Sequence, residues 1–208
     1  MKQVEKEHYK FSNYVTKIRW SSYWHQIDEA VNAKKILVVG VGDGIVPAVL
    51  KQIGEGGSVK TFDYDEALKP DYTGDLREIH KSVKDEKFDC ILCSQVLEHL
   101  EYKDVDAILQ YFSTHAEKVV ISIPACYWNL FIINIKLPLI KKFVLSLKIP
   151  KIFKAFKFDG EHYWEMGAKG YSKRKIKRDM NKYFVILKEY HVPENPYHYF
   201  FILQVPKL

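Results

Sequence analysis

The sequence predicts an α/β protein with a doubly wound, mostly parallel sheet that ends in an antiparallel hairpin. Residues 36–39 form a continuously apolar run, as expected for a strand that is buried on both faces, and a glycine-rich turn follows directly. Further apolar runs alternate with helix-like stretches as far as residue 125. Two β-like runs, 183–191 and 197–205, end the chain, and the VPENP break between them is typical of an antiparallel pair.

The remaining elements follow from periodicity and punctuation. Strands are expected at about 35–40, 58–63, 71–74, 88–94 and 117–124, and helices at about 20–31, 45–53, 102–115 and 173–182. Pro47 suits the first turn of its helix, where its missing N–H is no loss, and Ser172 can cap the last helix. A length of 208 residues predicts one domain, 1–208, in which 1–33 form an N-terminal helical cap and 125–170 form an insert.

The turn after the first strand is built for contact between main chain and ligand. It consists of Gly40, Val41, Gly42, Asp43 and Gly44. Its glycines permit positive φ and lack the Cβ atoms that would hold a ligand away. A dinucleotide fingerprint would need glycine at position 45, where Ile45 stands. The turn predicts a nucleotide-type site at the carboxyl end of the strand; a plain strand–helix connection is the alternative.

Polar residues follow the next strands at the same edge of the sheet. Asp63 ends the second strand, 23 residues after Gly40, where a carboxylate can accept hydrogen bonds from both hydroxyls of a ribose. An acid follows a turn in Thr73–Gly74–Asp75–Leu76. Ser94 and Gln95 leave the carboxyl end of the strand at 88–94.

These segments, with FDCILCSQVLEHL at 88–100, resemble the class I S-adenosylmethionine-dependent methyltransferases of the broad small-molecule group. The resemblance implies a Rossmann-like sheet of seven strands, S-adenosylmethionine as cofactor and methylation of a small molecule. It implies that the cofactor is bound by the turn 40–44, Asp63, Tyr64, Asp75, Leu76, Ser94 and Gln95, with Asp75 next to the adenine amino group. Val38 departs from the family, which usually has an acid two residues before the first glycine.

The cysteines and histidines do not point to a metal or a disulfide framework. Cys90 and Cys93 form a C-x-x-C pair, but residues three apart in a strand face opposite sides, so both are interpreted as core residues. The eight histidines show no H-E-x-x-H pattern, and we expect no metal site. Three cysteines and a polar N-terminus without a leader pattern predict a reducing, cytoplasmic location.

The insert carries the whole excess of positive charge. The formal charge of the chain is +6, and residues 127–158 contain seven lysines and no acid. Pro138 and Pro150 divide this apolar stretch, whose pieces 139–148 and 151–158 have near-helical spacing. We expect a lid over the sheet or, through 128–158, a peripheral contact with anionic membrane. Nucleic acid is an unlikely partner because arginine is absent from the stretch.

The residues DGEHYWEMG, 159–167, are the candidates on the acceptor side. His162 is expected to remove a proton from a hydroxyl, Glu165 to orient it, and Trp164 to form a stacking wall. The alternative is an ordinary loop anchored by a half-buried tryptophan. Glu98 and His99 are interpreted as capping and packing the helix after the fourth strand, and His191 and His198 as structural residues.

The function hypothesis is methyl transfer to a small molecule, with O-methylation of a saccharide or a lipid-linked intermediate as the first guess. The main alternative is a non-catalytic membrane-surface protein that keeps the fold. A nicotinamide-dependent oxidoreductase is a distant third, opposed by Ile45.

Overall fold

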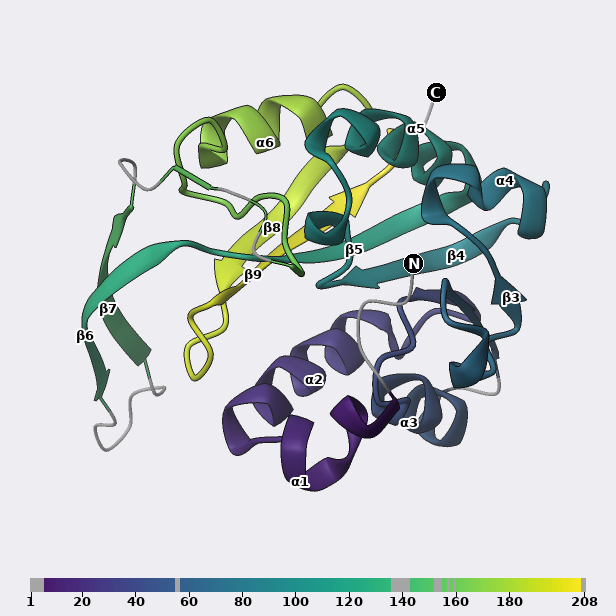
Figure 1. Cartoon of the computed structure of the whole chain (residues 1–208), viewed down its shortest axis with the longest axis horizontal. Helices are drawn as coiled ribbons and strands as arrows, with labels where there is room; N and C mark the ends of the chain where they lie inside the picture. The colour runs from purple at the N-terminus through teal and green to yellow at the C-terminus, as the bar shows by residue number, and fades with distance from the viewer. Residues whose placement is uncertain are drawn as a thin grey trace.

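The computed structural model describes residues 6–54, 57–135, 143–151, 155–156, 158 and 160–206. Its centre is a seven-stranded sheet in the order β3-β2-β1-β4-β5-β9-β8 (Figure 1). The strands are β1 (Lys35–Val39), β2 (Ser58–Asp63), β3 (Tyr72–Thr73), β4 (Phe88–Ser94), β5 (Ala116–Pro124), β8 (Val185–His191) and β9 (His198–Gln204). β1 to β5 pair in parallel, and β9 is antiparallel to both β5 and β8. The predicted doubly wound fold with a C-terminal antiparallel hairpin is confirmed.

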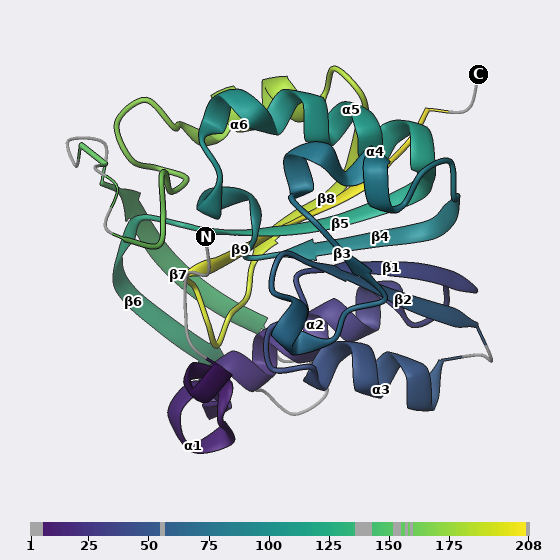
Figure 2. The ribbon, with the colours of Figure 1, turned by 45° about the vertical axis from the view of Figure 1, so that its right-hand side comes forward.

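Helices cover both faces of the sheet (Figure 2). α2 (Lys17–Ala30) and α3 (Ile45–Ile53) lie on one face, and α4 (Ile79–Ser82), α5 (Val105–His115) and α6 (Lys173–Met180) lie on the other. Short helical turns connect them: η1 (Lys6–Tyr9), α1 (Phe11–Tyr14), η2 (Glu66–Leu68), η3 (Leu76–Glu78), η4 (Leu97–His99) and η5 (Tyr102–Asp104). Thr16 caps α2 by accepting from the Arg19 N–H. Ser172 caps α6 by accepting from the Lys175 N–H, as predicted.

The sheet separates two apolar cores, because successive side chains of a buried strand point to opposite faces. Leu37 packs with the helices α4 to α6, whereas its neighbour Val38 packs with α2 and α3. Cys93 belongs to the first core and Cys90 to the second, and both are completely buried. The two sulfurs therefore lie on opposite sides of the sheet, which confirms that this C-x-x-C pair is part of the core.

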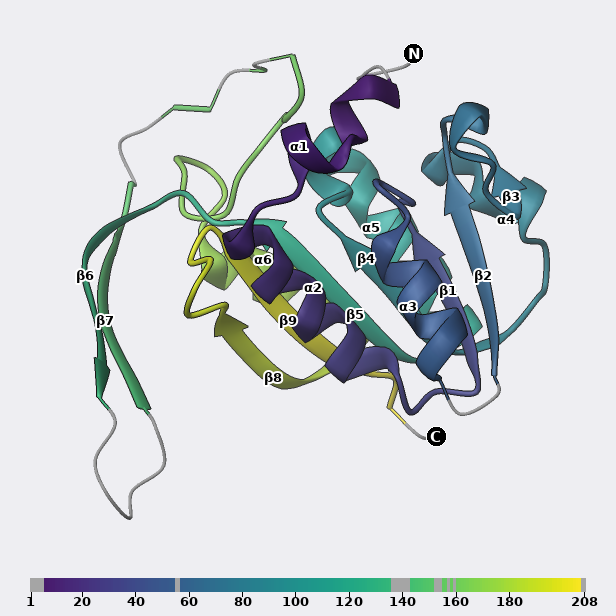
Figure 3. The ribbon, with the colours of Figure 1, turned by 90° about the horizontal axis from the view of Figure 1, so that it is seen from below.

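The first part of the insert forms a β-hairpin. β6 (Tyr127–Ile135) pairs antiparallel with β7 (Phe143–Pro150) in a separate two-stranded sheet, which projects to one side of the body (Figure 3). The helical interpretation of 139–148 is wrong for residues 143–148, because cross-strand pairing with the β-branched and aromatic residues of β6 outweighs the lysine spacing. Pro138 and the lysines at 136, 141 and 142 lie outside the described residues, as do parts of 151–158.

The glycine turn between β1 and α3 is stereochemically demanding, and its positions differ in the space around them. Gly40 has φ +86°, and a Cβ there would lie 2.5 Å from the Cγ2 of Val96. Gly42 has φ +56°, and a Cβ there would meet nothing within 4 Å. Both positions require the left-handed region, but only Gly40 also lacks room for a side chain.

We predict that Gly40→Ala destabilises the protein more than Gly42→Ala does. Each substitution places a Cβ in a left-handed conformation, which costs roughly 1–2 kcal/mol, and Gly40→Ala adds an overpacking penalty of roughly 1–3 kcal/mol against Val96. Urea denaturation of both variants measures the difference. Equal losses in the free energy of unfolding would contradict the close approach of Val96.

Candidate functional site

The glycine turn and Asp63 meet at the carboxyl ends of β1 and β2. The Val41 N–H donates a hydrogen bond of 2.6 Å to Oδ2 of Asp63, and the Gly40 N–H donates one of 2.8 Å to the Phe62 carbonyl. Oδ1 of Asp63 accepts from the Asp65 N–H at 2.9 Å. Because β1 and β2 are paired in register, the turn and the carboxylate adjoin, as the predicted sheet order requires.

The third strand brings Asp75 to the same edge. The Gly74 N–H donates to the main-chain carbonyl of Asp63 at 3.0 Å. The Asp75 carboxylate caps η3 and accepts from Nε of Arg77 at 2.9 Å. The Arg77 side chain thereby lowers the pKa of Asp75. Leu76 is buried beside it, and Tyr64 is exposed.

A small cavity opens in front of the turn, on the face of the sheet that α2 and α3 cover. Its volume is about 60 Å³, and its walls include residues 38–43, Ser94, Gln95 and His198. Two polar atoms in these walls, the Ser94 hydroxyl and Nδ1 of His198, are buried and have no hydrogen-bond partner among the described residues. Unpartnered buried polar atoms are uncommon in folded proteins, so this wall fits a polar ligand.

The end of β4 is held in an unusual conformation. Gln95 is one of few non-glycine residues with positive φ, at 55°. Its N–H donates to the Ser122 carbonyl at 2.9 Å, and its side-chain amide reaches the Ser122 hydroxyl at 3.3 Å. Strained backbone of this kind tends to occur at functional sites.

The N-terminal segment closes the cavity from outside. The Tyr23 hydroxyl donates a 2.6 Å hydrogen bond to Oδ2 of Asp43 in the turn, and the Arg19 guanidinium lies 3.7 Å over the Tyr14 ring. Tyr14, Arg19 and Tyr23 all line the cavity. Sites for small molecules typically have at least about 300 Å³. The cavity as it stands is smaller than a nucleotide-sized ligand requires.

A second group of polar side chains gathers around Glu165. Nδ1 of His162 lies 3.2 Å from Oε1 of Glu165, and the Tyr197 hydroxyl donates to the same oxygen at 2.5 Å. Glu165 is buried, whereas His162 is half-buried. The structure thus brings together the two residues that the sequence predicted for the acceptor side. Asp159, at the start of that peptide, lies outside the described residues.

Trp164 does not form a stacking wall. Its side chain is 1% exposed, its indole N–H donates to the Leu100 carbonyl at 3.1 Å, and the Tyr102 ring meets it edge-on at 4.9 Å. The prediction of a substrate-stacking role is wrong, because the ring is buried in the core and has no face open to a substrate. Trp164 instead anchors its loop against the segment that follows η4.

Glu98 and His99 lie beside His162, and neither caps a helix. They end η4, whereas α5 begins six residues after His99. Glu98 is completely buried, and neither of its carboxylate oxygens has a hydrogen-bond partner among the described residues. Burial raises the pKa of Glu98 to about 8. Nδ1 of His99 lies 2.8 Å from the Glu161 carbonyl, and the His99 and His162 rings meet edge-on at 5.0 Å.

The cavity and this second group belong to one region. Gln95 lines the cavity and Glu98 follows three residues later. His198 lines the cavity, and the preceding residue, Tyr197, binds Glu165. The sequence pattern predicts only a structural role for His198, whereas the structure also places it in the cavity wall. Its position at the start of the last strand is the sequence feature that indicates this location.

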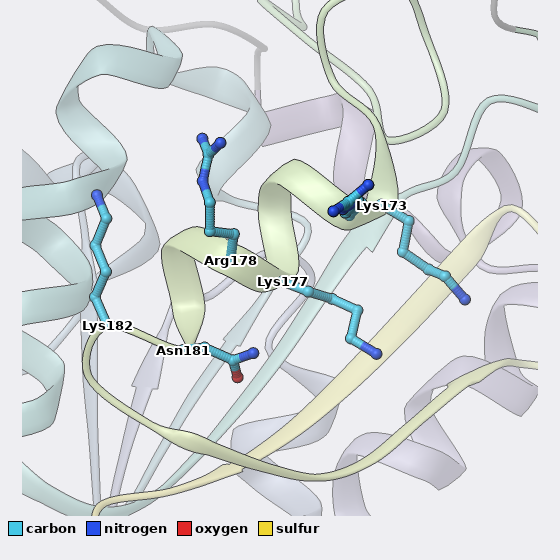
Figure 4. A pocket seen from close by; sticks show the side chains of 6 residues that line it. Lys173, Lys177, Arg178, Asn181 and Lys182 are labelled. Carbon is cyan, nitrogen blue, oxygen red and sulfur yellow. The ribbon is translucent and has the colours of Figure 1, made fainter.

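A larger hollow lies elsewhere, on the outer side of α6 (Figure 4). It has a volume of about 580 Å³ and is lined by Lys173, Arg174, Lys177, Arg178, Asn181 and Lys182. Lys177 pairs with Glu189 at 3.0 Å and Lys182 with Asp106 at 2.7 Å. α6 covers the opposite face of the sheet from α2 and α3, so this hollow is separate from the site at the glycine turn.

His198 makes stability depend on pH in a predictable direction. Burial, aided by the positive charge of Arg19, lowers the pKa of His198 to about 3. Below pH 6.5, His198 is protonated in the unfolded chain but stays neutral in the folded protein. The free energy of unfolding therefore falls as the pH drops towards 3. Between pH 7 and pH 5 the free energy of unfolding should fall by roughly 2 kcal/mol more in the wild type than in His198→Asn. Urea unfolding at both pH values measures this; parallel losses would contradict it.

Comparison with known proteins shows a similar domain over part of the chain and a shared fold. A methyltransferase-domain model matches residues 37–116, and no curated protein matches the sequence significantly. The PH0226 protein of Pyrococcus horikoshii OT3 has a TM-score of 0.61 at 14% identity, covering 98% of this chain and 100% of its own. The N-methyltransferase NodS of Bradyrhizobium japonicum WM9, in complex with S-adenosyl-L-homocysteine, has a TM-score of 0.61 at 8% identity, with coverages of 99% and 95%.

The glycopeptide N-methyltransferase MtfA, also complexed with S-adenosyl-L-homocysteine, has a TM-score of 0.58 at 12% identity, with coverages of 93% and 91%. Identities this low show that the fold is shared. The matched domain spans β1 to the start of β5, the part of the sheet that holds the glycine turn, Asp63 and Gln95. Residues 37–116 are therefore similar to a methyltransferase domain, and the chain shares the fold of these methyltransferases, as the resemblance of its motifs implied.

Proposed function

We propose that this protein is an S-adenosylmethionine-dependent methyltransferase that acts on a small molecule, first of all on a hydroxyl of a saccharide or a lipid-linked intermediate. The observation that supports it best is the meeting of the Val41 N–H and the Asp63 carboxylate beside a cavity with two unpartnered polar atoms. Open space in front of Gly42 and Gly44 leaves the main chain of the turn accessible. The second polar group is linked to this cavity through Tyr197, which binds Glu165 and precedes the cavity residue His198.

The cofactor would be held by residues from the ends of four strands. S-adenosylmethionine supplies an activated methyl group, so the protein chiefly has to align the acceptor with it. The main chain of residues 40–44 would contact the methionine part, together with Tyr64, Ser94 and Gln95. Asp63 would accept from the ribose hydroxyls, and Asp75 and Leu76 would adjoin the adenine. Arg19, in the N-terminal wall, is the cation suited to the methionine carboxylate.

His162 is the residue of the second group that can accept a proton from a hydroxyl. An ionised carboxylate can only accept a hydrogen bond, so Glu165 accepts one from the Nδ1–H of His162. In this tautomer the lone pair of the imidazole is on Nε2. The Tyr197 hydroxyl fixes Glu165 in turn. General-base catalysis of this kind contributes typically 10²–10⁴-fold. NodS and MtfA are N-methyltransferases by name, so an amine is the alternative acceptor, and His162 would serve it in the same way.

We predict that Asp63→Asn weakens the binding of S-adenosylmethionine at least about fivefold, the scale of a lost charge-assisted hydrogen bond. Isothermal titration calorimetry measures the dissociation constant. Asp65→Asn is the matched control, because the Asp65 side chain caps η2, whereas that of Asp63 accepts from the Val41 N–H of the turn. Unchanged affinity in a folded Asp63→Asn protein would assign the ribose to other residues, and no heat with the wild type would overturn the cofactor site.

A specific observation also supports a contact between the hairpin and a membrane surface. Both strands expose large apolar side chains, namely Trp128, Leu130, Ile133, Leu147 and Ile149, each more than 40% exposed. Trp128 and Ile149 are paired across the strands and share one face. Residues 127–158 contain seven lysines and no acid, which suits anionic lipid. No described residue between 125 and 170 lines the cavity, so a lid over it has less support. No helix in the described part of the chain has the length and apolarity to cross a membrane.

We predict that the protein floats with vesicles that contain phosphatidylserine, and that replacing both Trp128 and Leu130 by serine reduces the floated fraction at least threefold. The expected loss follows from the apolar area that these side chains would bury in the interface. Val185 and Leu187 on β8 are equally exposed, so their double serine variant is the matched control. Absence of flotation, or the same loss in both variants, would contradict the contact.

A further inference from the structure

We propose that Glu98, His99 and His162 bind one divalent transition-metal cation beside the cofactor cavity. Each of the three offers a ligand atom, and these atoms all lie within 4.8 Å of one another. Glu98 and His99 come from η4, and His162 comes from the loop that returns to it after the hairpin. The Tyr163 N–H donates to the Glu98 carbonyl at 2.8 Å, which fixes this loop against η4.

The burial of the Glu98 carboxyl group without hydrogen-bond partners is the first independent reason to place a cation here. Its side chain is completely buried, and its two carboxylate oxygens have no hydrogen-bond partner among the described residues. Burying a carboxyl group without partners is unfavourable, and proteins rarely tolerate it unless something satisfies the oxygens. A cation next to the two histidines would satisfy both oxygens at once.

The orientation of the histidines is the second reason. Nδ1 of His99 lies 2.8 Å from the Glu161 carbonyl, and because a carbonyl oxygen only accepts, that nitrogen carries the hydrogen. Nδ1 of His162 faces the Glu165 carboxylate at 3.2 Å and carries the hydrogen for the same reason. In both rings the lone pair is thus assigned to Nε2. Metal-binding histidines typically show this arrangement, with the other ring nitrogen bound to a carbonyl or a carboxylate.

The donor set selects the class of metal. Two imidazole nitrogens and one carboxylate suit Zn²⁺, Mn²⁺ or Fe²⁺, whereas Mg²⁺ and Ca²⁺ prefer oxygen ligands. Ligands around Zn²⁺ at 2.0–2.2 Å are about 3.4 Å apart, so side-chain rotation has to draw the present atoms closer. Three protein ligands leave a coordination position open, as in catalytic zinc sites. If the proposed function holds, an acceptor hydroxyl can occupy that position.

A proton and a metal ion exclude each other at His162, since both use the lone pair of Nε2. Proton acceptance by His162 therefore applies to the metal-free protein. In the metal-bound protein the cation itself lowers the pKa of a bound hydroxyl, whose proton leaves to solvent. Binding of the metal needs neither the cofactor nor the acceptor.

The test is metal binding by the full chain without a tag, stripped with a chelator and then desalted. Titration with Zn²⁺ or Mn²⁺ should give one site per chain, and the metal should raise the melting temperature. Glu98→Gln and His162→Asn should each weaken that affinity at least tenfold. Glu98→Gln should do so without lowering the melting temperature of the metal-free protein, because it removes a buried, unpartnered carboxyl group. His80→Asn, outside the cluster, is the matched control and should bind like the wild type.

The result that overturns the proposal is equally specific. Failure of the folded wild type to bind Zn²⁺ and Mn²⁺, or binding by Glu98→Gln as tight as that of the wild type, would exclude this site. Titration of the same sample with S-adenosylmethionine separates the two proposals. Cofactor binding without metal binding refutes the metal site alone, and metal binding without cofactor binding refutes the cofactor site alone.

Discussion

The hydrogen bond from the Val41 N–H to the Asp63 carboxylate joins the ends of β1 and β2, and the geometry of the site depends on it. It exists because β1 pairs in parallel with β2 on one side and with β4 on the other, so that three strands end at the same edge. A shift of one residue in either pairing would exchange the two apolar cores and move Asp63 away from the turn. The buried strands thus fix the position of the polar atoms that follow them.

The sequence predicted this half of the site well, because its signals are local. An apolar run bounded by glycines marks a buried parallel strand, and the topology of such sheets places the next strand end beside it. The boundaries of β2 and β4 agree with the expected 58–63 and 88–94. The hairpin was misjudged because lysine spacing is a weak guide where cross-strand pairs decide the structure.

The other half of the site depends on contacts that no local pattern records. His99 and Glu161 are 62 residues apart in the chain, yet the ring nitrogen of one meets the carbonyl of the other. Trp164 serves as the anchor: its burial draws the loop onto Leu100, and this brings His162 next to Glu98. The absence of a short-range metal motif could exclude only sites built from neighbouring residues. The cluster of Glu98, His99 and His162 is assembled by tertiary packing, so it could be found only from the folded structure.

Carboxylates lie near the N-terminal wall of the cavity, although the whole chain has a formal charge of +6. Asp43 and Glu98 both lie close enough to Tyr14 to add to the rise in its pKa, which burial begins. Asp63 acts in the same direction on Tyr9. In the proposed function, Asp43 and Asp63 would attract the positive sulfonium of the methyl donor. Residues 127–158 hold the excess of lysines, and none of the described residues among them lines the cavity.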